Sequence, residues 1–115
     1  MTKIYKFEEI IAWKKSKELS LAVYSEFKLC KDFSFRDQVQ RASVSIMNNI
    51  AEGFERQTDK EFKNFLYIAK GSAGEVRSML VLASDLGYIH KDMALRLSDQ
   101  ATEISKLLSG FIKTL

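Results

Sequence analysis

The chain has 115 residues, about the length of one domain, and 46% of them are hydrophobic against 29% charged. This balance supplies enough apolar material for a core and argues against a disordered chain. There is no proline and there are only five glycines, too few turn residues for a sandwich or a barrel, so a few long helices are expected. The net charge of +3 permits an anionic partner without requiring one, because the distribution of charge decides more than the total.

Cys30 is the single cysteine, which excludes an internal disulfide and a cysteine-cluster metal site. We interpret it as a small buried residue near the end of an apolar helical face. The N-terminus lacks the apolar segment of a signal peptide, and no apolar run approaches the roughly 18 residues of a membrane span. A cytoplasmic protein without a membrane partner is therefore expected.

The first predicted helix runs from about Phe7 to Cys30, and a short turn follows it. The second starts at Ser34, which we expect to be its N-cap, and ends near Arg56. Asp37, three residues on, favours the helix N-terminus through its charge. Apolar residues recur at helical spacing in both segments. These positions are Ala12, Ser16, Leu19, Val23 and Cys30 in the first helix and Phe35, Val39, Ala42, Ile46, Ile50 and Gly53 in the second.

The third predicted helix begins where Thr58 and Glu61 fit a capping box, in which each side chain binds the other's free backbone N–H. Gly87 ends it, because glycine adopts the left-handed conformation without steric cost. The fourth runs from about Asp92 to near the C-terminus. The apolar positions are Phe62, Leu66, Ala69, Ala73, Val76, Leu80 and Ala83 in the third helix and Leu97, Ala101, Ile104, Leu108, Phe111 and Leu115 in the fourth.

Short connections between long amphipathic helices force antiparallel neighbours. The predicted fold is therefore all-α, an antiparallel up-down four-helix bundle forming one domain over residues 1–115. Gly71 and Gly74 lie within the third helix, where each costs about 1 kcal/mol relative to alanine. Close approach of another helix backbone explains such glycines, and two tolerated weak positions are the alternative.

The second helix carries apolar residues on two faces. A helix of this kind needs two burial partners, and the other three helices cover one face. The second face predicts a homo-oligomer interface, because exposed apolar patches mark association; a monomer with a broad core is the alternative. We name these residues the apolar row. They are Val44, Met47, Ala51 and Phe54.

Polar residues follow the same helix at i, i+3 and i+4 spacing, and we name them the polar row. They combine positive, negative and amide groups along one edge. A solvated boundary and a hydrogen-bonded network between helices or subunits are both compatible with this pattern, since such groups are paired when buried. The polar row is Gln38, Arg41, Ser45, Asn49, Glu52 and Arg56.

The third helix holds the best signal for an anionic partner. Lys63, Lys70 and Arg77 recur every seven residues, and Lys60 and Tyr67 fall in the same sector; we name these five residues the basic stripe. Such a stripe is able to follow phosphates, and Tyr67 is able to stack on an unpaired base. A solvated charged face is the alternative. If the chain oligomerises, symmetry multiplies the stripe.

No catalytic or metal-binding constellation is found in the sequence. His90 stands alone in a turn, where a surface histidine is expected, and no Glu-x-x-His pair of a di-iron bundle occurs. The P-loop, GxGxxG, HExxH and nucleophile-elbow motifs are absent. Glu52 and Glu75 are able to meet across helices. Two carboxylates without a supporting cluster of polar residues do not indicate a catalytic site. We therefore predict no enzyme, no cofactor and no small-molecule substrate.

Residues 40–53 read Gln-Arg-Ala-Ser-Val-Ser-Ile-Met-Asn-Asn-Ile-Ala-Glu-Gly, and residues 65–72 read Phe-Leu-Tyr-Ile-Ala-Lys-Gly-Ser. With Trp13 upstream and Leu86-Gly87-Tyr88 downstream, this pattern resembles the four-helix-bundle family named for proteins encoded in intervening sequences of bacterial 23S ribosomal RNA genes. The resemblance covers nearly the whole chain. The polar members of the motif are fairly specific, because helix periodicity does not demand them.

The resemblance implies a bacterial cytoplasmic bundle that assembles into a ring-like homo-oligomer, with a pentamer as the expected count. The family is similar to the accessory proteins of diversity-generating retroelements, which are basic pentamers that bind nucleic acid and a reverse transcriptase. The positions that match the motif are Arg41, Asn49, Glu52, Arg56 and Glu75. The resulting hypothesis is a non-enzymatic homo-oligomer that binds RNA or DNA through a basic helix face. A protein-interaction scaffold without nucleic acid is the alternative.

Overall fold

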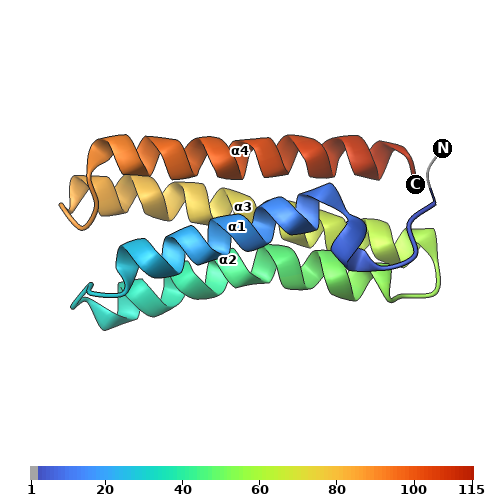
Figure 1. Ribbon diagram of the computed structural model, residues 1–115, viewed down its shortest axis with the longest axis horizontal. Coiled ribbons are helices and arrows are strands. Elements are labelled where there is room, and N and C mark those ends of the chain that lie inside the picture. The colour runs from blue at the N-terminus through green and yellow to red at the C-terminus, as the bar shows by residue number, and fades with distance from the viewer. Residues whose placement is uncertain (1–2) are drawn as a thin grey trace.

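The computed structural model describes residues 3–115, and these form four long α-helices with one short 3-10 turn and no strand (Figure 1). The all-α prediction is therefore confirmed. The bundle measures 44 × 22 × 19 Å along its principal axes. Its elements are η1 (Phe7–Glu9), α1 (Ile11–Phe27), α2 (Phe33–Phe54), α3 (Asp59–Asp85) and α4 (Lys91–Lys113).

Each helix packs against the two that adjoin it around the bundle. Helix α1 adjoins α2 and α4, and α3 adjoins the same two helices, whereas the backbones of α1 and α3, and of α2 and α4, stay apart on opposite sides of the core. Successive helices run in opposite directions, so the α1–α2 and α3–α4 turns lie at one end and the α2–α3 turn lies at the other (Figure 1). The predicted up-down bundle is confirmed, with four grooves between neighbouring helices.

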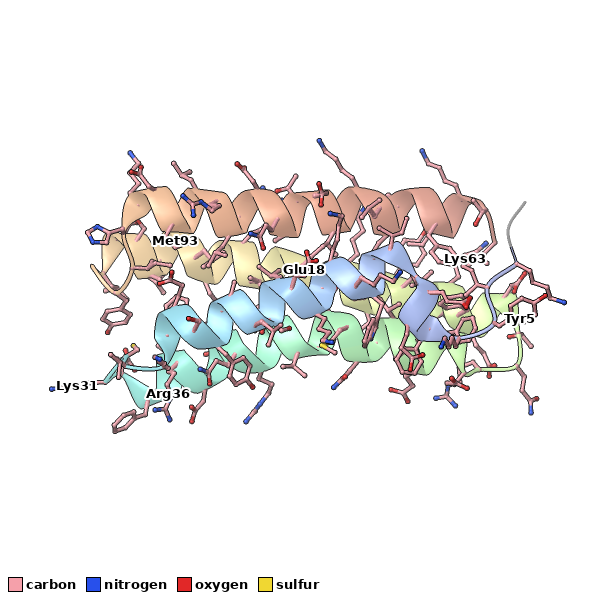
Figure 2. All side chains as sticks on the ribbon, in the orientation of Figure 1. Tyr5, Glu18, Lys31, Arg36, Lys63 and Met93 are labelled. Carbon is pink, nitrogen blue, oxygen red and sulfur yellow. The ribbon has the colours of Figure 1, made fainter. Side chains whose placement is uncertain are left out.

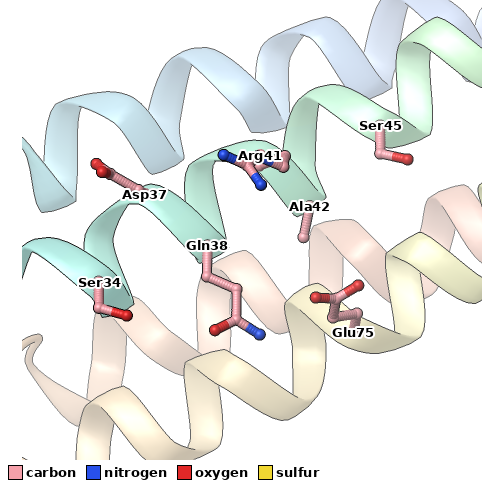
Figure 3. A pocket seen from close by; sticks show the side chains of 7 residues that line it. All are labelled: Ser34, Asp37, Gln38, Arg41, Ala42, Ser45 and Glu75. Atoms are coloured by element: carbon pink, nitrogen blue, oxygen red, sulfur yellow. The ribbon is translucent and has the colours of Figure 1, made fainter.

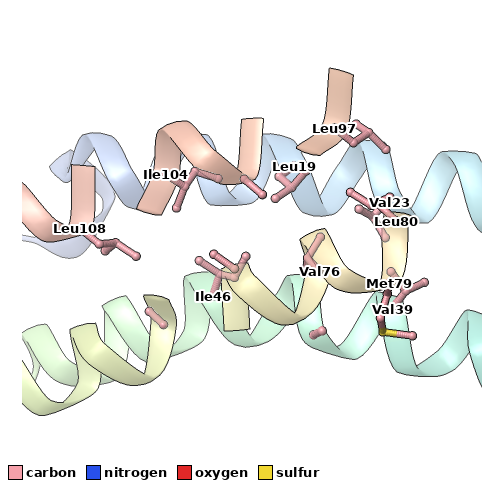
Figure 4. Close-up of a cluster of buried hydrophobic side chains, with 14 of the residues drawn as sticks. Leu19, Val23, Val39, Ile46, Val76, Met79, Leu80, Leu97, Ile104 and Leu108 are labelled. Carbon is pink, nitrogen blue, oxygen red and sulfur yellow. The ribbon is translucent and has the colours of Figure 1, made fainter. Parts of the chain in front are cut away.

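The core follows the predicted apolar positions, because a helix repeats each face about every 3.6 residues. Almost all of these positions are buried, and only Cys30, Phe111 and Leu115 remain half-buried at helix ends. Figure 4 shows the centre of the cluster, where side chains of all four helices meet. Fully buried members include Leu19, Val39, Ile46, Leu66, Leu80, Leu97, Ile104 and Leu108.

The first helix is shorter than predicted. The sequence pattern predicts one helix from Phe7 to Cys30, but η1 ends at Glu9 and α1 begins at Ile11. Ile10 between them has an extended backbone, with φ −75° and ψ 122°, and is only 2% exposed. The chain leaves the helical path there because the bend carries Ile10 into the core. The charged side chains of the bundle point outward, as Figure 2 shows for Lys31 and Arg36.

The second helix is capped by Asp32 instead of the predicted Ser34. An Asp32 carboxylate oxygen accepts a hydrogen bond from the backbone N–H of Phe35 at 3.2 Å, and the helix starts one residue before Ser34. Aspartate and serine are nearly equal N-caps, so propensity alone does not choose between neighbouring candidates. Asp32 is the N-cap because its second carboxylate oxygen accepts a hydrogen bond from the Tyr88 hydroxyl at 2.7 Å, which holds the side chain in place.

The caps of α3 largely follow the prediction. The Thr58 hydroxyl accepts from the Glu61 N–H at 3.2 Å, which confirms Thr58 as the N-cap. The reciprocal bond differs, since the Glu61 carboxylate accepts from Gln57 N–H at 3.3 Å and not from Thr58. At the other end Gly87 has φ +77°, the left-handed conformation expected of a helix stop. Helix α4 begins at Lys91, with His90 as an N-cap whose side chain makes no capping bond.

The explanation offered for Gly71 and Gly74 is wrong. A Cβ built on either residue would meet no atom within 4 Å, because both face solvent. The close approach occurs instead at Gly53 of α2, where a Cβ would lie 2.6 Å from the Cβ of Phe65 and 2.9 Å from Cδ1 of Phe62. Gly53 therefore allows α2 and α3 to pack closely near the turn that joins them.

Candidate functional site

The basic stripe lies on the side of α3 that faces α4. Ser84 is one heptad beyond Arg77, and it lines a groove of about 150 Å³ together with Ala94 and Ser98 of α4. Residues one heptad apart on a helix share a face, so Lys63, Lys70 and Arg77 border the same α3–α4 groove. The three cations at heptad spacing therefore lie along one groove.

The cations of the basic stripe have no counter-ion among the described residues. Lys60 and Arg77 are exposed, Lys63 and Lys70 are half-buried, and Tyr67 is 56% exposed. Within residues 3–115, no carboxylate lies within 4.0 Å of any of the four cations, since the ion pairs formed are elsewhere. Positive charge that is not neutralised internally remains available to an external anion.

The centre of the polar row forms a hydrogen-bonded network between α2 and α3. The Ser45 and Ser72 hydroxyl oxygens are 2.9 Å apart, with either able to donate. The Asn49 amide donates to the Ser45 carbonyl at 2.8 Å and to the Ser45 hydroxyl at 3.0 Å. All three side chains are half-buried. The network interpretation describes these positions, because polar groups in a helix seam need partners.

The C-terminal part of the polar row packs against an aromatic ring of α3. The Arg56 guanidinium lies 4.8 Å from the centroid of the Phe65 ring and 3.6 Å from the Glu52 carboxylate. Both charged side chains are about half exposed, which makes the ion pair weak. The cation–π contact and the close approach at Gly53 act on the same phenylalanine, so these residues hold α2 against α3.

The N-terminal part of the polar row lines an open groove between α2 and α3. Figure 3 shows Gln38 reaching from α2 toward α3 and Glu75 of α3 pointing back toward α2. Arg41 and Glu75 are exposed and make no ion pair with each other in the described structure. The groove has a volume of about 580 Å³, and its lining residues are Ser34, Asp37, Gln38, Arg41, Ala42, Ser45 and Glu75.

The apolar row lies on the side of α2 that faces α1 and is half-buried at all four positions. Val44 lines a shallow groove together with Tyr24 of α1. The Phe54 ring packs edge-on against Phe62 at a centroid distance of 6.0 Å, and Phe54 joins the core. Helix α1 thus covers part of the row, while Val44, Met47 and Ala51 keep some exposed apolar surface.

The described residues contain no group of three or more histidine, cysteine or carboxylate side chains placed to hold a metal. His90 is exposed at the start of α4, apart from any cluster. Glu52 is engaged by Arg56 and Glu75 faces the α2–α3 groove, so the structure assigns these two carboxylates to different surroundings. In the same part of the chain, no helix is both long enough and apolar enough to span a membrane.

Comparison with known proteins decides the family. The model of the family described as 23S rRNA-intervening sequence protein matches residues 8–110. The chain belongs to this family. It is also 31% identical to a solved protein of unknown function from the S23 ribosomal protein family of Bacteroides thetaiotaomicron VPI-5482, with a TM-score of 0.83. That match covers 90% of this chain and 99% of the other, and no curated protein matches the sequence.

The intervening-sequence motif of this family member is concentrated at the α2–α3 seam. Its glycine, Gly53, gives the space that Phe65 occupies, and its Asn49 belongs to the seam network with Ser45. Arg56 covers the Phe65 ring. These contacts assign a packing role to most of the motif, whereas Arg41 remains open to a partner.

Two features of this intervening-sequence protein escape sequence reasoning. The first joins the two turns at one end of the bundle, where the Tyr88 hydroxyl donates to Asp32 at 2.7 Å. That hydrogen bond, followed by the one from Phe35 N–H, lowers the pKa of Asp32, and the same bond raises the pKa of Tyr88. The two residues are far apart in the chain, so no local pattern relates them.

The second feature is a row of hydroxyl side chains on α4, all half-buried. The spacing of four, three and four residues is helical and offers a signal in the sequence. Sequence reasoning passed over it because serine and threonine are common on solvated faces. The row consists of Ser98, Thr102, Ser105 and Ser109.

Proposed function

We propose that this chain is a non-enzymatic, homo-oligomeric bundle of the cytoplasm that binds RNA or DNA through the basic stripe of α3, as an accessory or assembly factor. The observation that carries the proposal is the basic stripe itself. Its cations share one side of one helix and make no ion pair within the described chain. A linear polyanion is the partner that such a row fits best.

The dimensions of the stripe support this choice. Seven residues of helix rise about 10 Å, so Lys63, Lys70 and Arg77 span about 20 Å. Each strand of a duplex places one phosphate about every 3.4 Å of its axis, so the stripe extends past several nucleotides. Tyr67, 56% exposed, adds an aromatic surface on which a base is able to stack.

Assembly strengthens the proposal. The family resemblance implies a ring-like homo-oligomer with a pentamer as the expected count, and the apolar row of α2 retains exposed surface. Repetition of a three-cation stripe around a ring raises the total affinity for a long nucleic acid without any new contact. A mild net charge of +3 per chain is then compatible with useful binding.

Fluorescence anisotropy with a labelled structured RNA and a labelled DNA, over a series of salt concentrations, tests the proposal. The wild type should bind, and its affinity should fall steeply as salt rises, because binding releases counterions. The triple variant Lys63→Gln, Lys70→Gln, Arg77→Gln should lose binding. A matched control removes three exposed cations elsewhere, Lys14→Gln, Lys17→Gln and Lys31→Gln.

The control variant has the same net charge as the stripe variant, so it separates position from total charge. Retained affinity in the stripe variant, or equal losses in both variants, would refute the assigned site. No binding of the wild type to either nucleic acid would refute the function.

The scaffold without nucleic acid is the second candidate, and the half-exposed apolar row favours it. This candidate predicts that the chains associate through the apolar row and that a rise in salt concentration does not dissociate them. Light-scattering mass then distinguishes Val44→Asp and Met47→Asp from the wild type, since a buried unpaired carboxylate is costly at an interface. Circular dichroism controls for folding, and an unchanged mass in both folded variants would contradict the interface.

A further inference from the structure

We propose that the whole groove between α3 and α4 is a track for a single phosphodiester backbone, with the α4 hydroxyls of Ser98, Ser105 and Ser109 binding the phosphates that the α3 cations attract. This inference rests on the proposed function and deepens it. It adds a second helix to the site and names the part of the nucleic acid that is recognised.

The register of the two helices places hydroxyls opposite cations. At one end, Ser84 of α3 shares a groove with Ser98 of α4. Toward the other end, the rings of Phe62 and Phe111 lie 5.3 Å apart. Because the helices are antiparallel and rise equally, each step back along α3 matches one step forward along α4.

Counted from these two contacts, Arg77 lies opposite residues 96–105 of α4, which include Ser98 and Ser105. Lys70 lies opposite residues 103–112, which include Ser105 and Ser109, and Tyr67 lies opposite residues 106–115, which include Ser109. The α4 hydroxyls therefore recur over the same length of the bundle as these α3 side chains.

The three serine hydroxyls are available to a ligand. Within the described residues the Thr102 hydroxyl donates to the Ser98 carbonyl at 3.0 Å, but Ser98, Ser105 and Ser109 make no side-chain hydrogen bond. All of them are half-buried. A serine hydroxyl offers one donor, and phosphate oxygens commonly accept from serine as well as from lysine and arginine.

The α3–α4 groove differs from the other three grooves in its carboxylates. Asp37 lines the α1–α2 groove, Glu75 lines the α2–α3 groove, and Glu9 lines the α1–α4 groove. On the described α3 and α4 faces between Lys63 and Arg77 there is no carboxylate, and Asp85 appears only at the far end. Phosphate therefore meets like-charge repulsion in the other grooves, and in this one only near Asp85 at its end.

The two remaining acids of this region of α4 face elsewhere. Glu103 forms an ion pair with Lys15 of α1 at 3.1 Å. Asp99 lies one heptad before Lys106, which lines the α1–α4 groove, so Asp99 points toward that side. Both helices thus keep carboxylates away from the part of the α3–α4 groove between Lys63 and Arg77.

Gly74 leaves the middle of the track open. It lies one heptad before Val81, which lines the α3–α4 groove, and a Cβ there would meet nothing within 4 Å. The absence of a side chain lets a strand approach the α3 backbone, and glycine has this use wherever a ligand comes close to a backbone. The exposed Tyr67 ring beside the track favours a single strand, whose bases are free to stack.

Binding of a short labelled oligothymidylate to the intact chain, measured against salt concentration, tests the inference with two triple variants. Ser98→Ala, Ser105→Ala, Ser109→Ala should weaken binding about tenfold or more, because three hydrogen bonds to phosphate are lost. Its slope of log affinity against log salt should equal that of the wild type, since no charge is removed. Lys63→Gln, Lys70→Gln, Arg77→Gln should flatten that slope by about 2, at about 0.7 per phosphate contact of a single strand.

A steric variant gives an independent reading that does not depend on hydroxyls. Gly74→Leu fills the track and should weaken binding about tenfold or more, an expected size for a blocked contact. Gly110→Leu is the matched control, because Gly110 is also open within 4 Å but lines the α1–α4 groove. Thermal melting by circular dichroism confirms that each variant is folded, as expected when leucine replaces a helix glycine.

The outcomes separate this inference from the function on which it rests. A wild type that binds no oligothymidylate but binds duplex refutes the single-strand track and leaves the function standing. Loss of binding in the cation variant with wild-type affinity in both the serine variant and Gly74→Leu refutes the α4 side of the site. A serine variant with an altered salt slope contradicts its assigned neutral role.

Discussion

Replacement of Gly53 by alanine is the sharpest test of the packing described above. Alanine normally strengthens a helix interior relative to glycine by about 1 kcal/mol, so propensity alone predicts a more stable protein. The added Cβ would lie 2.6 Å from the Cβ of Phe65, 2.9 Å from Cδ1 of Phe62 and 3.3 Å from the Phe62 carbonyl oxygen. The Phe65 Cβ and the Phe62 carbonyl belong to or adjoin the α3 backbone and are unable to rotate away.

The magnitude follows from the distance that the helices must move. Carbon atoms prefer separations of about 3.5–4.0 Å, so α2 and α3 must part by about 1 Å at this point. Strain of this kind in a packed interior costs about 1–3 kcal/mol, which exceeds the gain in propensity or at least cancels it. Because parting also weakens the Arg56 contact with Phe65, we expect a net loss of about 1–2 kcal/mol.

Urea unfolding followed by circular dichroism measures this loss, and a loss of this size should lower Tm by roughly 4–8 °C in a chain of this length. Gly71→Ala is the matched control, since its Cβ would meet nothing within 4 Å and it should gain about 0.5–1 kcal/mol. The reasoning fails if the two variants shift stability in the same direction, or if Gly53→Ala is the more stable of the two.

Three further substitutions test contacts between helices. Tyr88→Phe removes the hydrogen bond that lowers the pKa of Asp32 and raises the pKa of Tyr88. At neutral pH the wild type should therefore have an advantage, a higher free energy of unfolding in urea than the variant. It should disappear as pH falls through the lowered pKa of Asp32 and as pH rises through the raised pKa of Tyr88; a constant advantage would contradict the linkage. Ser20→Ala should raise stability by about 1 kcal/mol, because the buried Ser20 hydroxyl has no partner among the described residues. Ser45→Ala should cost about 1 kcal/mol in thermal melting, and the cost should shrink in a background that already carries Ser72→Ala.

Much of the fold is predictable because it depends on one-dimensional periodicity. A segment such as α3 repeats apolar residues at helical spacing, and Leu66 and Leu80 are buried wherever the partner helices come from. The start of α3 at Thr58 and its end at Gly87 are also local, since capping and the left-handed conformation depend on a few adjacent residues. Likewise the heptad recurrence of the basic stripe places its cations on one face before the fold is known.

The errors share a different cause, which is dependence on distant residues. Asp32 displaces Ser34 as the N-cap because Tyr88, from the other turn, holds it. The bend at Ile10 shortens the first helix because the core draws that side chain in. The close contact of α3 with Gly53 and the open surface at Gly74 depend on which helix lies opposite. The helix propensity of glycine is the same in both cases and does not distinguish them.

The sequence by itself determined four amphipathic helices, their order, their core faces and one basic face, because each follows from spacing along a single helix. Only the tertiary structure decided which grooves carry acids and which do not. It set Ser84 of α3 beside Ser98 of α4, Ser45 of the polar row against Ser72, and Asp32 against Tyr88. The physical reason is that a groove has two walls, and the second wall comes from residues whose distance along the chain carries no periodic signal.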